Sequence, residues 1–319
     1  MKVCKDSAMT AENLKAEIKR LKDEKNAVIL AHYYQRDEIQ EIADHIGDSL
    51  ALARYAATLK DAKIIVLCGV HFMGETAKIL CPDKKVLIPD MEAGCSLADS
   101  CDPVEFGKFI KEHPGHTVIS YVNTSVGVKA LTDIVVTSGN AEKIVGSLPA
   151  DTKIIFGPDR NLGGYINSKL GRNMILWNGA CHVHEQFSLE KLIELKKQHP
   201  GAKVLVHPEC KKSIALLADK IGSTAALLAY ADSEEAGDTF IVVTESGILC
   251  ELRKKYPEKT FIPAPPEDGT CACNECSYMK LNTLEKLYEC LRDETPEIII
   301  DKELADKARR PIERMLELS

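Results

Sequence analysis

Three cysteines in polar, glycine-containing segments have the chemistry of a metal centre. Cys95, Cys181 and Cys276 end the segments EAGC, NGAC and GTCACNEC. Three thiolates leave a centre one protein ligand short of the usual four, which suits catalysis: a zinc ion would keep a water, and an iron–sulfur cube would keep one iron open to a substrate oxygen. Sulfur-only ligation is softer than the histidine-containing sites typical of catalytic zinc. We therefore favour an iron–sulfur cluster, with zinc as the alternative.

The last of these segments holds more sulfur than a cluster needs. Cys273 and Cys276 form a C-x-x-C pair, which can bind a metal or close a disulfide. A zinc knuckle would need a second C-x-x-C or paired histidines at a fitting distance, and neither follows. A redox-sensitive disulfide beside the cluster ligand is the other use. Cysteines within or beside apolar stretches are expected to pack as small hydrophobic residues: Cys68, Cys81, Cys101, Cys210, Cys250 and Cys290.

Histidines at the ends of apolar runs are candidates for proton transfer. His32, His184 and His207 each follow or close such a run and have polar neighbours, although burial as core histidines is the alternative. Glu209 lies two residues after His207, so in an extended chain both side chains point to the same face. The pair can act together as acid and base.

Three small-residue turns put hydroxyl groups where helices are expected to begin. They are Asp48-Ser49, Ser138-Gly139 and Ser223-Thr224. Free N–H groups and the helix dipole favour a carboxylate or phosphate at such places. Plain helix capping explains any one of these turns, but their recurrence favours anion binding.

Short β-branched runs alternate along the chain with longer amphipathic stretches. This alternation is typical of βαβ units with parallel sheets. Nine runs are predicted to be strands: Ala27–Ala31, Lys63–Leu67, Val86–Ile88, Thr117–Tyr121, Lys153–Phe156, Met174–Trp177, Lys203–Val206, Thr239–Val243 and Thr260–Ile262.

A weak internal repeat relates these elements. The strand ends at His32, Tyr121 and His207 are spaced by 89 and 86 residues, and the three serine-containing turns by 89 and 85. The three cysteines are spaced by 86 and 95 residues, and the larger value fits a longer third loop. We infer three α/β units. Because ligands of parallel α/β units sit at the carboxyl ends of strands, we expect these loops to converge on one central site.

The predicted organisation is an α/β fold of three pseudo-symmetric, three-layer αβα domains with parallel sheets around a central active site. Thr10 is the expected cap of a helix over Ala11–Lys25, and Asn282 of a helix over Thr283–Arg292; a last helix follows over Lys302–Leu318. The expected segments are an N-terminal helix packing on the first domain at 1–25, α/β repeats at 26–112, 113–198 and 199–280, and C-terminal helices at 281–319.

Composition restricts the class of partner. The 319 residues are 45% hydrophobic and 28% charged, with a net charge of −7, the wrong sign for binding a nucleic-acid backbone. No apolar run approaches the 18 or so residues that cross a bilayer, and the N-terminus lacks the apolar centre of a signal peptide. We expect a cytoplasmic protein with small-molecule ligands, no nucleic acid and no membrane. A reducing cytosol would keep most of the twelve cysteines as thiols, which disfavours a disulfide scaffold.

With these residues assembled, the chain resembles the quinolinate synthase family over nearly its full length. The resemblance rests on eight segments: AHYYQ at 31–35, GDSL at 47–50, EAGCSLAD at 92–99, YVNT at 121–124, CHVHE at 181–185, HPEC at 207–210, GST at 222–224 and CSYMK at 276–280. It implies three α/β domains about a pseudo-threefold axis. The implied activity is that of a transferase of de novo NAD synthesis, which condenses iminoaspartate with dihydroxyacetone phosphate to quinolinate and releases phosphate and water.

The resemblance also implies roles for particular residues. One 4Fe-4S cluster per chain would be bound by Cys95, Cys181 and Cys276, with an open iron as Lewis acid. Proton transfer is assigned to Tyr121, His207 and Glu209. The implied substrate-binding residues are His32, Ser49, Tyr121, Val122, Asn123, Ser138, His207, Pro208, Glu209 and Thr224. Tyr34, Asp48, His184 and Ser223 are similar to further active-site positions. A functional link to an aspartate-oxidising enzyme is expected.

The third cysteine segment departs from the family pattern, because some members have one cysteine where this chain has three. Cys276 is the expected ligand since it directly precedes the run SYMK, and Cys273 is the alternative. A rival interpretation is an iron–sulfur or zinc sensor in which Cys271, Cys273 and Cys276 respond to oxidants. It predicts a basic face for DNA or a partner surface, and the acidic chain offers neither. A metal-dependent aldolase or hydro-lyase acting on another small acid is the closer enzymatic rival.

Overall fold

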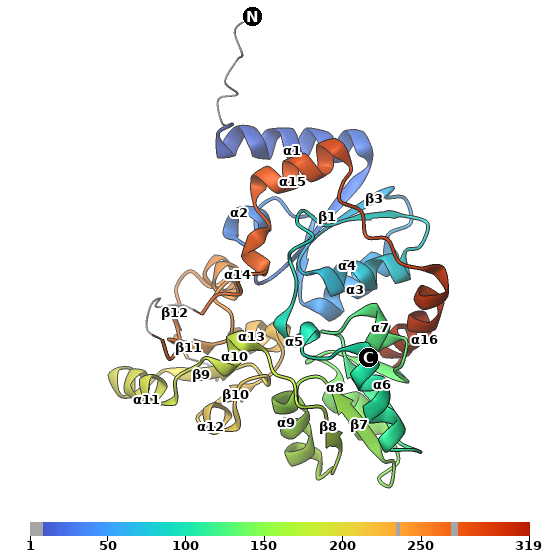
Figure 1. Cartoon of the computed structure of the whole chain (residues 1–319). Helices are drawn as coiled ribbons and strands as arrows, with labels where there is room; N and C mark the ends of the chain where they lie inside the picture. The colour runs from blue at the N-terminus through green and yellow to red at the C-terminus, as the bar shows by residue number, and fades with distance from the viewer. Residues whose placement is uncertain (1–8, 234–236, 269–273) are drawn as a thin grey trace, which may run out of the picture.

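The chain folds into three parallel sheets with helices packed on both faces of each (Figure 1). The computed structural model describes residues 9–233, 237–268 and 274–319. This architecture confirms the predicted α/β class and its three αβα units. Cys4, Cys271 and Cys273 lie outside the described residues, as does the disulfide predicted for Cys273.

The same topology occurs three times. In each sheet the strand order is second, first, third, fourth, and every pairing is parallel. We call each sheet with its helices a unit. The strands are β1 (Ala27–His32), β2 (His45–Gly47), β3 (Ile64–Cys68) and β4 (Lys85–Leu87) in the first unit; β5 (Thr117–Tyr121), β6 (Ile134–Val136), β7 (Ile154–Gly157) and β8 (Ile175–Leu176) in the second; and β9 (Lys203–Val206), β10 (Lys220–Ile221), β11 (Thr239–Val243) and β12 (Thr260–Pro263) in the third.

Nine of these strands coincide with the predicted apolar runs. The other three are the second strand of each unit, β2, β6 and β10, which have only two or three residues and lie at the edge of their sheets. Length does not explain the difference, because β4 and β8 are as short and also lie at the edges of their sheets, yet they coincide with predicted runs. The repeated strand order is the feature that places β2, β6 and β10.

The helices fill the connections. They are α1 (Ala11–Lys25), α2 (Asp37–Gln40), α3 (Ser49–Thr58), α4 (His71–Leu80), α5 (Ser96–Asp99), α6 (Pro103–Glu112), α7 (Val126–Lys129), α8 (Ala141–Ser147), α9 (Arg160–Leu170), α10 (His182–Glu185), α11 (Leu189–Gln198), α12 (Lys212–Ala215), α13 (Thr224–Tyr230), α14 (Ile248–Lys255), the 3-10 helix η2 (Met279–Leu281), α15 (Leu284–Asp293) and α16 (Lys302–Leu318).

Two predicted helix caps have different outcomes. Oγ1 of Thr10 accepts the N–H of Asn13 at 3.3 Å, so the predicted cap of α1 is confirmed. The predicted cap of α15 is wrong. Thr283 takes that position and accepts the N–H of Lys286 at 3.3 Å, whereas the fully buried Asn282 donates to the carbonyl of Gly69 at 2.8 Å.

The first and last thirds of the chain meet on the first sheet. Helices α1 and α15 lie side by side over it (Figure 1). Leu14 and Ile18 of α1 and Leu287 and Leu291 of α15 pack in one buried cluster with Ile29 of β1. Burying each such side chain stabilises the fold by about 1.5–3 kcal/mol. The N-terminal helix is therefore held by a segment some 270 residues away in sequence.

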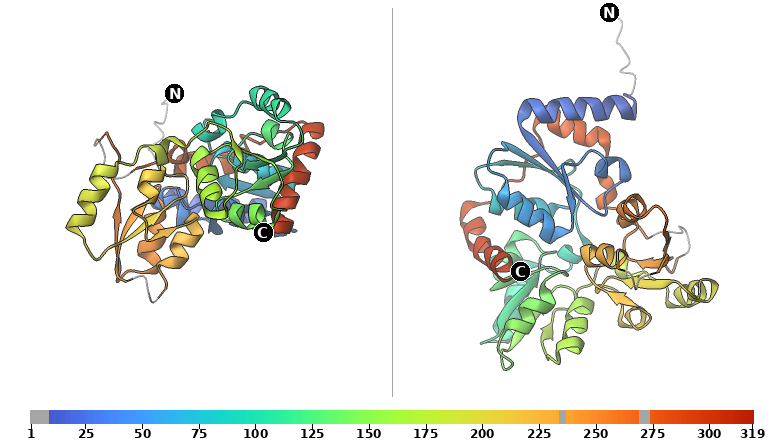
Figure 2. Two further views of the ribbon diagram at one scale, coloured as in Figure 1. Left: turned by 90° about the horizontal axis from the view of Figure 1, so that it is seen from below. Right: turned by 180° about the vertical axis from the view of Figure 1, so that it is seen from behind.

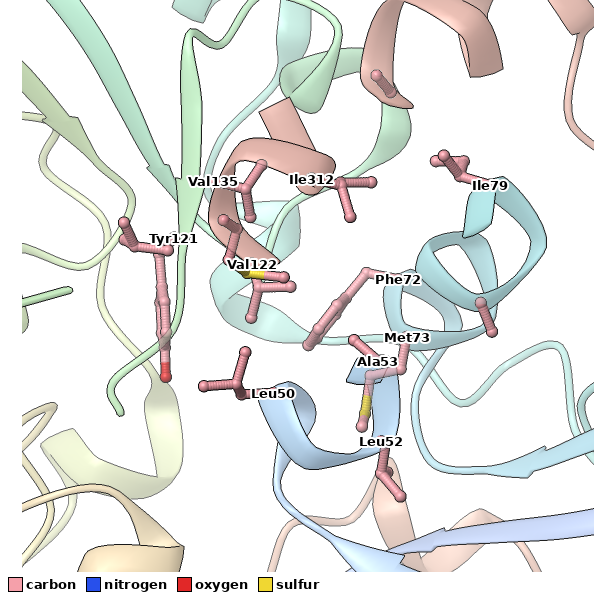
Figure 3. Close-up of a cluster of buried hydrophobic side chains, with 14 of the residues drawn as sticks. Leu50, Leu52, Ala53, Phe72, Met73, Ile79, Tyr121, Val122, Val135 and Ile312 are labelled. Carbon is pink, nitrogen blue, oxygen red and sulfur yellow. The ribbon is translucent and has the colours of Figure 1, made fainter. Parts of the chain in front are cut away.

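The C-terminal helix α16 joins the first unit to the second. Ile312 and Met315 of α16 belong to a buried cluster that also contains Phe72 of α4, Val122 after β5 and Val135 of β6. Figure 3 shows Ile312 among side chains of both units, with Tyr121 at the margin of the group. The first and second units thus share one hydrophobic core.

The third unit has cores of its own. Phe240 and Leu252 pack on one face of its sheet, and Val204 and Ile241 on the other. Among the described residues of the first unit, Tyr33 and Tyr34 are the ones that add to these clusters. In the views of Figure 2 the third unit, in yellow and orange, lies beside the other two.

Helices α6 and α11 each pack on the sheet that follows them in the chain, which concerns the predicted limits between the repeats. Phe106 of α6 packs with Val118 of the second sheet, and Leu192 of α11 packs with Val204 of the third. By packing, each unit therefore begins with a helix that precedes its first strand. The limits at residues 112 and 198 stay a prediction.

Among the described residues, no helix combines the length and apolar character needed to cross a membrane.

Candidate active site

A cavity of about 70 Å³ lies where the carboxyl ends of the three sheets meet. The repeat predicts this convergence, and the structure confirms it. The residues lining the cavity come from all three units: His32, Tyr34, Asp48, Ser49, Val70, Phe72, Met73, Gly94, Cys95, Ser96, Tyr121, Val122, Asn123, Thr137, Ser138, Cys181, His182, Val183, His184, His207, Glu209, Thr224, Glu245, Cys276, Tyr278 and Met279.

Nearly all residues named from the sequence are brought to this cavity. His32 ends β1, Tyr121 ends β5 and His207 directly follows β9, so each unit contributes the end of its first strand. Two residues are not brought there. Pro208 lines a separate pocket beside α9 and α12, and Ser223 caps helix α13 through the N–H of Ala226 at 3.3 Å without lining the cavity.

The three cysteines enter the cavity from equivalent loops. Cys95 directly precedes α5, Cys181 directly precedes α10, and Cys276 lies three residues before η2. Burial raises the pKa of Cys95 to about 12 and that of Cys276 to about 11, and it also raises the pKa of Cys181. In each case the backbone N–H three residues later acts in the opposite direction, at Ala98, His184 and Met279. Each sulfur thus faces the start of a helical turn, which favours a thiolate.

The residues beside the cysteines tie the loops together. Oγ of Ser96 lies 2.6 Å from Nδ1 of His182, and the same oxygen accepts the N–H of His182 at 3.3 Å. The ring of Tyr278 lies edge-on to that of His182, with centroids 6.0 Å apart. These contacts join the loops of the first, second and third units.

The spacing of the sulfurs bears on the kind of centre. Among the described residues, the donor atoms of Cys181, His184 and Glu209 are the one group of three that lies within 4.8 Å of one another. A single zinc ion with bonds of about 2.3 Å holds its sulfurs closer together than that. Cys95, Cys181 and Cys276 do not form such a group, so their three sulfurs do not all lie within 4.8 Å of one another.

Glu209 is the centre of a buried polar group. The hydroxyl of Tyr121 donates to its Oε1 at 2.5 Å. Nδ1 of His184 lies 3.1 Å from Oε2, although the ring is turned so that no well-aligned hydrogen bond forms. Burial alone would raise the pKa of Glu209, but His184 and the hydroxyl of Tyr121 outweigh it and hold the pKa below its usual range. Glu209 is therefore ionised at neutral pH.

A chain of hydroxyl groups continues from His184. Its Nε2 lies 2.9 Å from Oγ1 of Thr244. The hydroxyl of Tyr34 lies 2.7 Å from that oxygen and 3.0 Å from Oγ1 of Thr224. Sequence inspection missed Thr244, which directly follows β11, because it was included in no motif.

The two strand-end histidines are neutral. Burial lowers the pKa of His32 and of His207 to about 3. Nδ1 of His32 accepts the N–H of Tyr34 at 3.1 Å, and Nδ1 of His207 accepts the N–H of Glu209 at 3.4 Å. This bonding assigns the proton of each ring to Nε2, which in His207 lies 3.3 Å from Oγ of Ser138. Both rings can therefore donate a hydrogen bond to an anion.

The serine-containing turns divide into capping and lining residues. Asp48 caps α3 through the N–H of Ala51 at 2.9 Å, which leaves the hydroxyl of Ser49 at the cavity. Thr224 takes the same first position in α13 and also lines the cavity. Ser138 caps nothing, since the cap position of α8 belongs to Asn140.

A buried lysine holds the loop after β5. Lys129 is 0% exposed, and its ammonium donates to the carbonyls of Val122, at 2.8 Å, and of Thr124. It also lies 5.3 Å from the ring centroid of Phe72. Burial lowers its pKa to about 8. Because Val122 and Asn123 line the cavity, this lysine fixes part of its wall. Its burial could not be predicted from the sequence.

Comparison with known proteins places these features in a family. The family model described as Quinolinate synthetase A protein matches residues 16–317. A protein of Microcystis aeruginosa named Quinolinate synthase is 58% identical over 308 residues, which cover 97% of this chain and 96% of that protein. Proteins of the same name from Chloroherpeton thalassium and Thermosynechococcus vestitus are 58% and 57% identical, over 95% and 96% of this chain and 94% and 96% of their own.

Proposed function

This chain belongs to the Quinolinate synthetase A family, and from that membership we propose that it is a quinolinate synthase of de novo NAD biosynthesis. It condenses iminoaspartate with dihydroxyacetone phosphate to quinolinate, with loss of phosphate and water, and acts as a transferase. The observation that carries the proposal is the convergence of three cysteines and three strand ends, one of each from every unit, on a single cavity.

The proposed cofactor is one 4Fe-4S cluster bound by Cys95, Cys181 and Cys276. The donor set fits it, because three buried thiols face one cavity and each is approached by a backbone N–H that favours the thiolate. When bound, such a cluster supplies an open iron as a Lewis acid that polarises a hydroxyl or carbonyl oxygen. Cys273 stays the alternative third ligand.

The substrates are anions, and the cavity offers neutral hydrogen-bond donors to them. The hydroxyls of Ser49, Ser138 and Thr224 and the Nε2–H groups of His32 and His207 line it. Together with Tyr121, Val122 and Asn123 they would hold the carboxylates and the phosphate. Fixing two small anions side by side supplies the proximity that a condensation needs. Pro208 would contribute through its backbone, since its side chain lines another pocket.

Proton transfer is proposed for the Glu209 group. An ionised carboxylate bonded to a tyrosine hydroxyl can accept a proton and return one through the same contact. His207 adds a second ring whose Nδ1 lies 3.8 Å from Oε1 of Glu209. We assign the removal and return of protons during condensation and dehydration to Glu209, Tyr121 and His207.

Anaerobic purification followed by iron and sulfide analysis tests the cofactor. The wild type is expected to contain about four irons per chain and to form quinolinate from iminoaspartate and dihydroxyacetone phosphate. Cys95→Ser, Cys181→Ser and Cys276→Ser should each lose the cluster and the activity. A wild type that carries zinc or no metal, or variants that all keep the cluster, would contradict the ligand assignment.

The same preparation also tests whether iminoaspartate and dihydroxyacetone phosphate are the substrates. A wild type with an intact cluster that forms no quinolinate would overturn the proposed activity. An aldolase or hydro-lyase acting on another small acid would then be the better interpretation.

A further inference from the structure

Two buried acidic side chains accept the backbone N–H groups of the cysteines of the second and third units. Glu245 also lines the cavity, whereas Asp159 does not. We propose that Asp159 and Glu245 are positioning residues that fix the backbone of Cys181 and Cys276 for cluster binding. The inference rests on the proposed function, because it takes these cysteines as ligands. Neither carboxylate is itself assigned to the cluster or to substrate.

Asp159 connects the Cys181 loop to helix α9. It is 1% exposed. Its Oδ1 caps the helix by accepting the N–H of Leu162 at 2.7 Å, and its Oδ2 accepts the N–H of Cys181 at 3.2 Å. Both oxygens are therefore used, one on a rigid element and the other on the cysteine. A carboxylate with two acceptor oxygens can do this, whereas an amide offers a single acceptor oxygen.

Glu245 does the same in the third unit. It is fully buried, and its Oε1 accepts the N–H of Cys276 at 3.1 Å while its Oε2 accepts the N–H of Gly247 at 2.7 Å. The ammonium of Lys280 lies 3.0 Å from Oε1 and also donates to the carbonyl of Tyr34 at 2.7 Å. The loop of Cys276 is thus tied both to its own unit and to the strand end of the first unit.

The two carboxylates occupy equivalent positions in the repeat. Asp159 lies two residues after the end of β7, and Glu245 two residues after the end of β11. They are 86 residues apart, the spacing that also separates Cys95 from Cys181 and Tyr121 from His207. Two units with different sequences therefore use the same device, which argues against a chance contact.

The first unit lacks this device. Its equivalent position is Val70, two residues after the end of β3. There the loop of Cys95 is held by a backbone bond, from the N–H of His71 to the carbonyl of Ala93 at 2.7 Å. The assignment is accordingly restricted to the second and third cysteines.

These hydrogen bonds fix the orientation of the backbone at Cys181 and at Cys276. With its own N–H bound behind the loop, the cysteine has its thiol on the cavity side, where the N–H of His184 or Met279 faces the sulfur. Groups that orient metal ligands in this way commonly change metal retention about 10- to 100-fold when they are removed. We expect that range here.

Asp159→Asn and Glu245→Gln test the inference. Each variant and the wild type are reconstituted anaerobically, and the rate of iron loss to 2,2′-bipyridyl is followed by absorption. Both variants should lose iron about 10- to 100-fold faster than the wild type. The midpoint of thermal unfolding without the cluster separates an effect on the loop from an effect on the whole fold.

Asp133→Asn and Asp219→Asn are the matched controls. Their carboxylates also accept one backbone N–H each, of Val118 at 2.8 Å and of Val204 at 2.9 Å, in the same two units. Neither residue lines the cavity. These controls should retain iron like the wild type.

The outcomes are distinct. Folded Asp159→Asn and Glu245→Gln variants that retain iron like the wild type would overturn the positioning role and leave the proposed function intact. A wild type that binds no iron would overturn the proposed cluster. If Asp159→Asn does not fold, Asp159→Ser decides the matter, because serine can still cap α9 but cannot also accept the N–H of Cys181; fast iron loss supports the inference and normal retention refutes it.

Discussion

Glu209 combines burial with a negative charge, a costly arrangement unless neighbouring groups stabilise it. Tyr121 and His184 supply that stabilisation on opposite oxygens of the carboxylate. These groups come from the second unit and Glu209 from the third. The surroundings of Glu209 are therefore built by the contact between the two units.

Glu209→Gln should abolish most turnover while substrates still bind. The amide keeps an acceptor for Tyr121 but loses the charge and the proton affinity, and general acid–base catalysis commonly contributes about 10²- to 10⁴-fold. Steady-state kinetics should show kcat lowered in that range with KM little changed. Glu185→Gln is the control, since Glu185 bonds to Asn161 at 2.6 Å outside the cavity. Full turnover by Glu209→Gln would remove its acid–base role.

The two neutral histidines make stability depend on pH. His32 and His207 have an ordinary pKa of 6.5 when unfolded, and burial lowers it to about 3 in the folded chain. Below pH 6.5 the unfolded state binds protons that the folded state excludes. The stability present above pH 6.5 is therefore lost as the pH falls towards 3, by about 1.4 kcal/mol per pH unit for each histidine.

Urea unfolding at pH 7, 6 and 5 measures this loss. His32→Asn should reduce the dependence on pH by about 1.4 kcal/mol per unit below pH 6.5, because one of the two excluded protons is removed. An equal pH dependence in the wild type and the variant would contradict the burial of a neutral His32.

At the level of single residues, the regular spacing of the repeat is what predicts the site. His32, Tyr121 and His207 could be predicted because they end recognisable apolar runs at a regular spacing. Asp159 and Glu245 have the same spacing of 86 residues and were missed, since they follow third strands at which no ligand was expected. Lys129 could not be predicted, because its burial depends on carbonyls that only the folded loop presents.

Among the elements, the loop between β5 and α7 shapes the cavity. Val122 and Asn123 line it, and Lys129 binds the carbonyl groups on either side of Asn123. The short helix α7 supplies that lysine. A four-residue helix therefore determines the shape of a wall made by the preceding loop.

Lys129→Met should lower kcat/KM about 10- to 100-fold, because small displacements of binding groups have effects of that size. The two carbonyls would also lose a charged donor, at a cost of about 1.5–3 kcal/mol of stability. Kinetics on folded protein and urea unfolding measure the two effects. Lys84→Met is the control. It removes a lysine that donates to the carbonyls of Lys60 and Ala62, away from the cavity. Equal kcat/KM in both variants would refute the effect on the loop.

The elements that the sequence predicts well are those with a long amphipathic or apolar pattern. Helices α1 and α16 were placed with their observed limits. The four-residue helices were not, because they carry too few residues to show a period. Strands β2 and β10 contain a single isoleucine each and so form no apolar run, whereas β6 is a short β-branched run that was missed.

At the scale of the whole molecule, the hydrophobic cores define two bodies: one contains the first and second units, and the other contains the third unit. The first and second units share a buried cluster completed by α16, and the third unit has clusters of its own. The active-site groups join the two bodies through polar contacts such as that of Tyr121 with Glu209. Substrate and cofactor would therefore add to the contact between the bodies.

Ile312→Ala and Leu252→Ala should affect different unfolding transitions. Each removes a fully buried side chain, at a cost of about 2–5 kcal/mol. Fluorescence of Trp177, the single tryptophan, reports the second unit, and far-UV circular dichroism reports the whole chain. Ile312→Ala should shift the fluorescence transition in urea, and Leu252→Ala only the circular dichroism. The exposed Lys302→Ala is the control. Equal shifts of both signals by both variants would mean a single cooperative unit.

The identical strand order of the three units has a consequence for how this protein can vary. In a trimer of separate identical chains, every substitution would appear three times around the axis. Joined in one chain, the copies can diverge singly, so that Val70, Asp159 and Glu245 fill one position in three ways. The proposed condensation of two unlike molecules would use that freedom, because a threefold site would offer each of them three equal places.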